Sequence, residues 1–462
     1  MIKAILFLAL TWAYDAHVEV DIRKSMSTVE HIVEEGYRLK ITNKTQRNLN
    51  QVKFRLEENA FNHLRIIQIS DAYRNITQTS VIESNNFVVK LDTPKLPNES
   101  FSLHVKLYYY NILAFKPYKI KLREDQYVEL VDNINNLVLD DIFTINHFEA
   151  GYLLYSKAIE YSKKNVMSHR EMEGGYHEYR IEPYLYDKIR PFKNYKVRFY
   201  FMMNKPFDVF LNTEREIYIS MWGNVFENNR FYAMNQAAEI DGEYSNIDFF
   251  AGDFQTGKNS LRWISTNLPG DLWGLSITDE VGNVTKPYAA KLGDAIKLNL
   301  IPRFSLFGGW KSNWFVSYNQ KLRKFIKRDT NDHSLYKLSY PIGYEFDLVL
   351  SEKFVLKVCL PEFAEVINID TKFDYISKSV KREYGLFELF GQECHEYQFI
   401  NVLPFIFDDN FEITFRYKNI YMYSKLFVLI GLITFLSAIV FVLARIDLRM
   451  EDRKADTKQK SG

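Results

Sequence analysis

Residues that could bind a metal ion or perform acid–base chemistry form only incomplete motifs in this sequence. His177-Glu178 and His395-Glu396 begin like the HExxH zinc motif, but neither is followed by the second histidine. The adjacent carboxylates Asp140-Asp141 and Asp408-Asp409 would face opposite sides of a strand, which disfavours a shared metal ion. Gly308-Gly309 precedes a tryptophan instead of the Lys-Ser/Thr pair of a phosphate loop, and no Gly-x-Ser-x-Gly elbow occurs. The sequence therefore predicts no catalytic residue, no metal ligand and no cofactor.

Two other residue types point to covalent modification. Four Asn-x-Ser/Thr sequons are candidates for N-glycosylation: Asn43, Asn75, Asn98 and Asn283. The chain has two cysteines, Cys359 and Cys394. In an oxidising compartment they could form one disulfide, worth roughly 3–4 kcal/mol, and a pair of free thiols is the alternative.

Both ends of the chain carry targeting features. Residues 1–13 combine a lysine, a short apolar run and a small residue at Ala13, which predicts a signal peptide; the alternative is a buried first strand or helix. The uncharged run 426–444 predicts a transmembrane helix, because at 1.5 Å per residue it covers roughly 28 Å. Basic residues in the segment 445–462 place a short tail in the cytosol. Together these signals predict a single-pass type I protein of the endoplasmic reticulum membrane, with its bulk in the lumen.

Two finer features accompany the predicted span. Lys458 and Lys460 have the spacing of a dibasic endoplasmic-reticulum retrieval signal, although an ordinary solvated tail would look the same. Gly431, Thr434 and Ala438 share one helical face, where small residues let another helix approach closely. Ordinary membrane-helix composition is the alternative.

Composition excludes several classes of protein. The 462 residues include 59 Lys+Arg and 58 Asp+Glu, so the net charge of +1 gives no broad basic face and no nucleic-acid partner is expected. A mean hydropathy of -0.25 excludes a multi-spanning membrane protein. The 36 Phe and 31 Tyr favour strands.

Strict alternation of apolar and polar residues predicts a mainly β protein. Five runs show it most clearly: 18–23, 101–109, 195–201, 296–300 and 411–417. Strands with one wet face are typical of antiparallel sandwiches, so we expect two tandem β-sandwich lumenal domains, 14–211 and 212–420, before the helix. The strand 216–220 with its Trp-Gly-Asn turn and the strand from Val18 with its polar turn suggest two related layouts. One helix is expected over Tyr152–Met167.

Several motifs resemble the ribophorin I family, the large single-span subunit of the oligosaccharyltransferase complex. The matching runs are Pro302–Lys311 with its Phe-Gly-Gly-Trp turn, Tyr318-Asn319, Asp279–Thr285, Ile217–Val225, Leu360–Glu362 and, in the first half, Ile120–Val128 with Glu124 and Gln126. The chain departs from the family at Ser305, where proline is usual, and in 132–148, where an aromatic and proline-rich segment is expected. The short segment after the span resembles the fungal or protist type.

The resemblance implies a non-catalytic subunit in protein N-linked glycosylation. In that family the active site, the metal ion and the dolichol groove belong to a separate multi-spanning subunit, which transfers a preassembled glycan to Asn-x-Ser/Thr. The implied partners are the other oligosaccharyltransferase subunits and nascent polypeptides. A lumenal chaperone or cargo receptor and a type I surface adhesin are the rival interpretations. For the Phe307–Trp310 turn, a core role is favoured over a contact edge for a partner.

Overall fold

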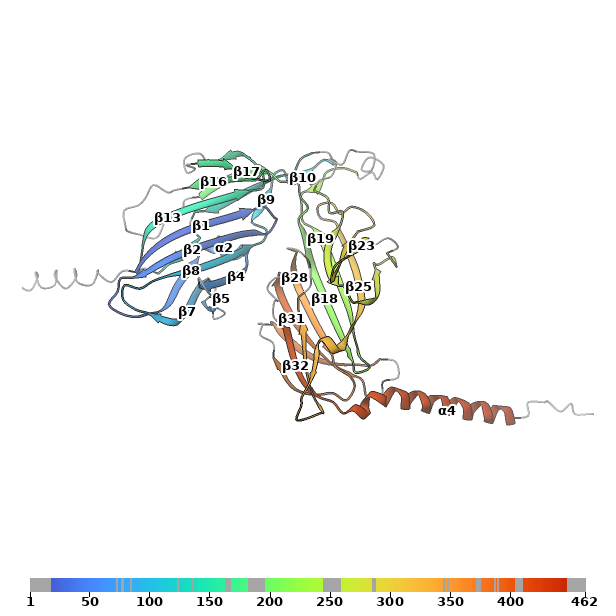
Figure 1. Cartoon of the computed structure of the whole chain (residues 1–462). Coiled ribbons are helices and arrows are strands. Elements are labelled where there is room, and N and C mark those ends of the chain that lie inside the picture. The colour runs from blue at the N-terminus through green and yellow to red at the C-terminus, as the bar shows by residue number, and fades with distance from the viewer. Residues whose placement is uncertain are drawn as a thin grey trace, which may run out of the picture.

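The computed structural model describes a chain built almost wholly of strands (Figure 1). The described residues are 18–71, 74–75, 79–83, 85–122, 124–134, 136–140, 142–162, 168–181, 196–243, 259–284, 288–343, 346, 349–370, 375–385, 388, 390–403 and 410–446. The predicted signal peptide and the retrieval lysines Lys458 and Lys460 lie outside them. The mainly β prediction with one C-terminal apolar helix is confirmed.

The first β unit, residues 18–207, packs a large sheet against two smaller ones. The large sheet has the order β15 (Ser168–Glu171), β16 (His177–Ile181), β13 (Phe143–Leu154), β1 (Val18–Thr28), β2 (Val33–Asn43), β8 (Ser100–Tyr109), β4 (Leu64–Asp71) and β5 (Arg74–Asn75). One smaller sheet contains β14 (Ala158–Tyr161), β17 (Lys196–Met202), β11 (Tyr127–Asn133) and β9 (Leu113–Phe115). The other contains β12 (Leu137–Leu139), β3 (Leu49–Leu56), β7 (Asn86–Lys95) and β6 (Thr79–Glu83), and the short helix α2 (Glu58–His63) follows β3.

The second β unit, residues 208–417, has the same layered plan. Its large sheet has the order β30 (Ser377–Glu383), β31 (Gln392–Val402), β28 (Leu350–Cys359), β18 (Asp208–Ser220), β19 (Asn224–Asn235), β25 (Lys311–Lys321) and β22 (Trp273–Thr278). One smaller sheet contains β29 (Glu365–Asp370), β32 (Asn410–Arg416), β27 (Leu335–Pro341) and β26 (Ile326–Arg328). The other contains β21 (Ile264–Pro269), β24 (Ala295–Leu300) and β23 (Tyr288–Leu292), and the 3₁₀ turn η1 (Leu322–Lys324) follows β25.

The second unit repeats most of the strand order of the first. In both large sheets the unit's opening strand pairs antiparallel with the next strand and parallel with a later one: β1 with β2 and β13, and β18 with β19 and β28. The same chain order then places β8 and β25 beside the second strand, and β4 and β22 beyond them. The smaller sheets also correspond, with β9, β11, β17 and β14 matching β26, β27, β32 and β29. The related layouts suggested by the sequence therefore extend through both layers.

Two large clusters of buried apolar residues lie inside these units. One extends from Val18 to Phe207 and the other from Phe210 to Tyr417, while a small third cluster around Tyr110, Val209 and Leu403 joins them. We therefore propose a boundary between Phe207 and Phe210, because β18 runs through the sequence-based boundary at 211/212.

The helix expected over Tyr152–Met167 is wrong for its described part. Residues up to Leu154 belong to β13, and β14 follows from Ala158. In β13 the residues Phe148, Ala150, Tyr152 and Leu154 alternate inward, so the strand periodicity that precedes Tyr152 simply continues. Residues 163–167 lie outside the described part of the chain.

Each unit has a buried cation where its first two strands meet the opposite layer. In the first unit Lys24 Nζ lies 2.5 Å from Glu35 Oε1 and 2.6 Å from Asp132 Oδ2, and none of these side chains is more than 1% exposed. Burial alone would lower the pKa of Lys24, but Asp132 and Glu35 raise it above its ordinary value. Burial raises the pKa of Glu35, and Lys24 only partly offsets this, because two carboxylates share one ammonium.

The second unit has its cation at the equivalent register position. Arg215 of β18 lies opposite Asn229 of β19, and Lys24 of β1 lies opposite Tyr37 of β2 in the same way. In each second strand the glutamate comes two residues before that partner, as Glu227 before Asn229 and Glu35 before Tyr37. Arg215 Nη2 lies 3.0 Å from Glu227 Oε2, and Arg215 Nη1 donates to Ile342 O at 3.0 Å, beside the end of β27. In both units the buried cation therefore ties the large sheet to the smaller one, through Asp132 in the first unit and Ile342 O in the second.

The Lys24 ion pair predicts a sharp contrast between two neighbouring substitutions. Lys24→Met leaves two carboxylates buried without their cation, so the free energy of unfolding should fall by about 3–5 kcal/mol. Urea unfolding of the full chain followed by far-UV circular dichroism measures this. Arg23→Met is the control, because Arg23 is 69% exposed and pairs with Glu149 at 3.6 Å; its effect should stay within about 0.5 kcal/mol. Equal effects of the two substitutions would contradict the role given to Lys24.

Candidate functional site

The predicted glycosylation sites differ in their accessibility. Asn43 ends β2 and is fully buried, and its Nδ2 donates to Arg47 O at 2.9 Å and to Lys95 O at 3.1 Å. Its Oδ1 accepts a bond from the Thr45 hydroxyl at 2.6 Å. A glycan on Nδ2 would have to break these contacts, because no solvent reaches the amide.

Asn98 and Asn283 lie in exposed turns. Asn98 stands between β7 and β8 with a φ of 65°. Asn283 follows a turn closed by Asp279, whose Oδ1 accepts bonds from the backbone N–H groups of Val281 and Gly282 at 2.9 Å. The Arg303 guanidinium beside Asp279 holds the pKa of that carboxyl below its ordinary value, so the turn keeps its anion at neutral pH. Asn75 lies in β5, and its side chain is outside the described part.

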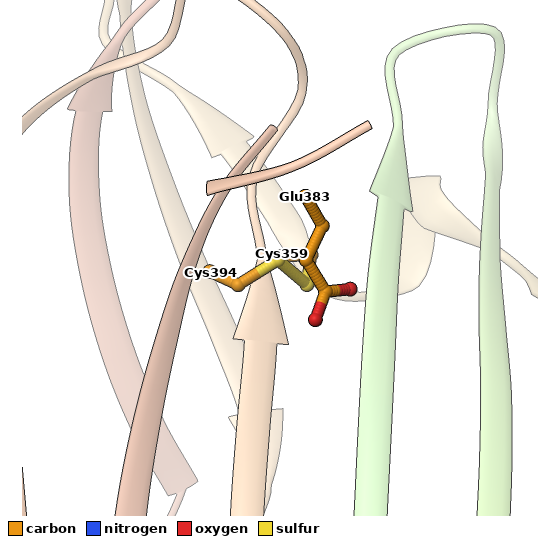
Figure 2. Close-up of side chains that lie close together, drawn as sticks. All are labelled: Cys359, Glu383 and Cys394. Carbon is orange, nitrogen blue, oxygen red and sulfur yellow. A yellow bond between two sulfur atoms is a disulfide. The ribbon is translucent and has the colours of Figure 1, made fainter. Parts of the chain in front are cut away.

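The structure joins Cys359 and Cys394 in a disulfide between the adjacent strands β28 and β31 (Figure 2). Glu383 of β30 points toward the two sulfurs. These three residues form the one group among the described residues whose ligand atoms are close enough to hold a metal ion. Because both sulfurs are bonded to each other, neither is a thiolate, and the group does not fit a metal site.

The incomplete motifs found in the sequence lie apart from one another. His177 on β16 contacts His169, with 3.0 Å between Nε2 of His169 and Nδ1 of His177. His395 is buried on β31 in the other unit. Asp140 is exposed, and Asp141, Asp408 and Asp409 lie outside the described residues. These incomplete motifs therefore do not combine into one site in the described part of the chain.

A fixed junction connects the second unit to the apolar helix α4 (Ser424–Arg445), which follows the 3₁₀ turn η3 (Asn419–Tyr423). Lys425 Nζ lies 2.7 Å from Glu388 Oε1, a side chain that is 1% exposed. Burial would raise the pKa of Glu388, but the bonds from Lys425, the Gly385 N–H and Gln392 hold it below its ordinary value. The first turn of the helix is therefore bonded to the β structure by a charged pair.

Helix α4 itself has the properties of a membrane span. It is the described helix that is long and apolar enough to cross a bilayer, and it lies away from the β units with no buried residue (Figure 1). Gly431, Thr434 and Ala438 are exposed on it, and the Thr434 hydroxyl donates to Gly431 O at 2.8 Å. A threonine bonded to its own helix presents a small surface, which suits close approach of a second helix.

Two of the motifs that carry the family resemblance, Ile120–Val128 and Pro302–Lys311, meet where the two units join. Gln126 of the first unit is fully buried; its Nε2 donates to Met203 O at 2.8 Å, and its Oε1 accepts from the Ala238 N–H at 3.0 Å. Beside it, β10 (Lys119–Ile120) pairs with β20 (Glu239–Ile240) across the two units. Asn235 Oδ1 accepts from the N–H of Phe207, the last residue of the first unit, at 2.9 Å, and its Nδ2 donates to Leu306 O at 2.9 Å. Gln126 and Asn235 therefore hold the segments that connect the units.

The Phe307–Trp310 turn packs against the same segments. A Cβ on Gly308 would lie 2.2 Å from Ala238 O, and Gly309 has a φ of +82°. Phe307 is fully buried and its ring meets Trp310 edge-on at 5.4 Å. Both glycines are therefore required by the backbone, which supports the core role favoured from the sequence.

Sequence reasoning missed the buried charges. Lys24, Glu35 and Arg215 each occupy an inward position of an alternating strand, where an apolar residue is expected. A charged residue at an inward position of an alternating strand was the sequence feature that could have indicated a buried ion pair. Their partners Asp132 and Ile342 lie far away in the chain, so no local pattern could have paired them.

Comparison with known proteins gives a consistent family assignment. A family model described as Ribophorin I matches residues 18–444. The Caenorhabditis elegans dolichyl-diphosphooligosaccharide–protein glycosyltransferase subunit 1 is 26% identical over 292 residues, which cover 62% of this chain and 47% of that protein. Subunit 1A of Arabidopsis thaliana is 23% identical over 97% of this chain and 73% of its own length. The match thus spans about half of the worm relative.

Solved structures add little. An M1 zinc metallopeptidase from Deinococcus radiodurans aligns with a TM-score of 0.25 and 12% identity, covering 44% of this chain and 47% of its own. So low a similarity carries no argument about function.

The accessibilities predict which sequons carry glycans. In protein isolated from its own membranes, Asn98 and Asn283 should be occupied and Asn43 should not. Enzymatic deglycosylation in ¹⁸O-water followed by peptide mass spectrometry measures each site. A glycan on Asn43 in the folded protein would contradict the buried geometry described above.

The Phe307–Trp310 turn predicts a position-specific effect of a single methyl group. Gly308→Ala forces Cβ into the backbone at Ala238, so the free energy of unfolding should fall by about 2 kcal/mol or more. Gly151→Ala is the matched control, because its Cβ would meet nothing closer than 3.9 Å. Far-UV circular dichroism during urea unfolding follows both variants, because it reports on the strands of both units. If both variants unfold at the same urea concentration, the close approach at Gly308 is not structurally important.

Proposed function

This chain belongs to the ribophorin I family, and we propose that it is a non-catalytic subunit of an oligosaccharyltransferase complex. The observation that carries the proposal is the family match over residues 18–444, which includes both β units and almost all of α4. Relatives named as subunit 1 of the dolichyl-diphosphooligosaccharide–protein glycosyltransferase support it. In this proposal the chain supports en bloc transfer of a lipid-linked oligosaccharide to Asn-x-Ser/Thr, while the reaction takes place in a multi-spanning subunit.

The proposed placement is the endoplasmic reticulum membrane, in type I orientation, with both β units in the lumen. The Cys359–Cys394 disulfide supports an oxidising compartment, and the basic residues after α4 support a cytosolic tail. Lys458 and Lys460 would then act as a retrieval signal.

The two joints described above suit a structural arm. The Glu388–Lys425 pair connects the second unit to the membrane helix, and Gln126 with Asn235 connects the first unit to the second. A rigid chain of this kind can hold a surface at a set distance from the bilayer. We propose that it helps position acceptor polypeptides near the catalytic subunit.

Depletion of the chain provides the functional test. N-glycan occupancy on many secretory proteins should fall, because the complex loses a structural arm. The purified full chain, supplied with lipid-linked oligosaccharide, an acceptor peptide and Mn²⁺, should transfer no glycan. Quantitative glycoproteomics and a gel-shift assay measure the two results. Normal occupancy after depletion would favour the cargo-receptor interpretation, and metal-dependent turnover by the purified chain would contradict a non-catalytic role.

A further inference from the structure

A cavity of about 220 Å³ opens between the layers of the second unit, next to the buried ion pair. Arg215, Asn229 and Gln320 line it from the large sheet, and Leu268 lines it from β21. Phe325 and Phe346 supply aromatic walls. The volume is below the ~300–1,000 Å³ typical of sites for drug-sized ligands and above the ~150 Å³ that holds a benzene molecule in another protein. It therefore suits one substituted six-membered ring.

In the first unit, side chains fill the region that corresponds to the cavity. Asn229 corresponds in register to Tyr37, since these residues face Arg215 and Lys24 respectively. Gln320 corresponds to Tyr109, since these residues face Val225 and Val33. Tyr37 is 1% exposed and Tyr109 is fully buried, and both hydroxyls donate to Glu35. The cavity thus occurs where the second unit has amides in place of two tyrosine rings.

The cavity is lined by polar groups that can form hydrogen bonds with a ligand. Arg215 is 6% exposed, and its Nη atoms are bonded to Glu227 and to Ile342 O. Asn229 and Gln320 add amide groups that can both donate and accept.

The charge balance selects the class of ligand. Arg215 is paired with Glu227 at 3.0 Å, and Lys324, the other cation in the lining, is paired with Asp271 at 2.6 Å. The described lining therefore offers no unpaired charge for an anion. A neutral ligand that has hydroxyl groups and an apolar ring face matches this lining. The amides can bond to its hydroxyls, and the phenylalanine rings can contact its apolar face.

We propose that this cavity binds one neutral pyranose residue of a saccharide. Its hydroxyls would exchange hydrogen bonds with the amides of Asn229 and Gln320, while its C–H face lies against Phe325. This inference goes beyond the proposed subunit role, because it concerns a binding activity of the chain alone and does not require glycan transfer.

The test uses purified full chain in lipid nanodiscs and saturation-transfer difference NMR. The probes are methyl α-D-mannopyranoside, N-acetylglucosamine and the neutral peptide acetyl-Asn-Ala-Thr-amide. At least one sugar should receive saturation from the protein, with a Kd on the order of millimolar, as expected for a single small ring. No sugar signal at 20-fold that concentration would overturn the proposal. Signal only from the peptide would overturn the saccharide class.

Gln320→Tyr is the decisive variant, because it places a tyrosine at the position where the first unit has Tyr109. The new ring should fill the cavity while its hydroxyl keeps a bond to Glu227, as Tyr109 does to Glu35. Sugar affinity should fall at least tenfold. Ser317→Tyr is the control, because Ser317 lies on β25 in the alternate, partly exposed positions and does not line the cavity; it should bind as the unchanged protein does. Equal binding by Gln320→Tyr and the unchanged protein would overturn the proposal.

A second variant covers the case in which Gln320→Tyr does not fold, which its tryptophan emission would reveal. Phe325→Ala removes the half-buried aromatic wall and leaves the ion pair intact. It should also weaken sugar binding at least tenfold. Unchanged affinity in a folded Phe325→Ala protein would contradict the site.

Discussion

The architecture of this chain depends on a buried cation held between the first two strands of each β unit. Lys24 and Arg215 occupy the same register position and each pairs with a glutamate of the next strand, Glu35 or Glu227. In each unit the cation also bonds to the end of a strand in the opposite layer, through Asp132 and Asn133 O in one and Ile342 O in the other. Because an unpaired buried charge is so costly, these contacts fix which layers can face each other.

The two units use the same frame differently. The first surrounds its cation with tyrosines whose hydroxyls satisfy the carboxylates, and so encloses it completely. The second has Asn229 and Gln320 at the corresponding places and keeps an open cavity beside Arg215. A duplicated fold thus contains one closed copy, suited to a structural role, and one copy that keeps room for a ligand. The joint at Gln126 and Asn235 links the two copies, and the Lys425–Glu388 pair links the second to α4.

The sequence predicted the fold class because a strand with one solvent-exposed face requires alternating apolar and polar residues, and this alternation is visible in the sequence. Residues 101–109 and 411–417 alternate throughout, and β8 and β32 follow them closely. The apolar helix was equally visible, since charges bracket it. The helix prediction over Tyr152–Met167 was wrong in its described part, because only a window that includes Phe148 reveals the strand period.

The sites were harder to predict, for a physical reason. A sequon identifies an asparagine that can be glycosylated, but it does not show whether that asparagine is buried. Asn43 and Asn98 therefore look alike in the sequence, although the Asn43 amide is buried and bonded to the backbone at Arg47 and Lys95. The buried ion pairs and the cavity depend on contacts between strands more than a hundred residues apart, such as Lys24 with Asp132. Only register, and the comparison of one unit with the other, shows that Gln320 stands where Tyr109 does.

The central claim, that this chain is a subunit of a glycosyltransferase complex, is tested most directly by stoichiometry. The full chain, tagged at one end and expressed at its normal level, can be purified from membranes in a mild detergent and analysed by quantitative mass spectrometry. The account predicts a multi-spanning glycosyltransferase subunit at close to one copy for each copy of this chain, with further subunits in fixed ratio. Recovery of the chain alone, or with many secretory proteins in variable amounts, would contradict it.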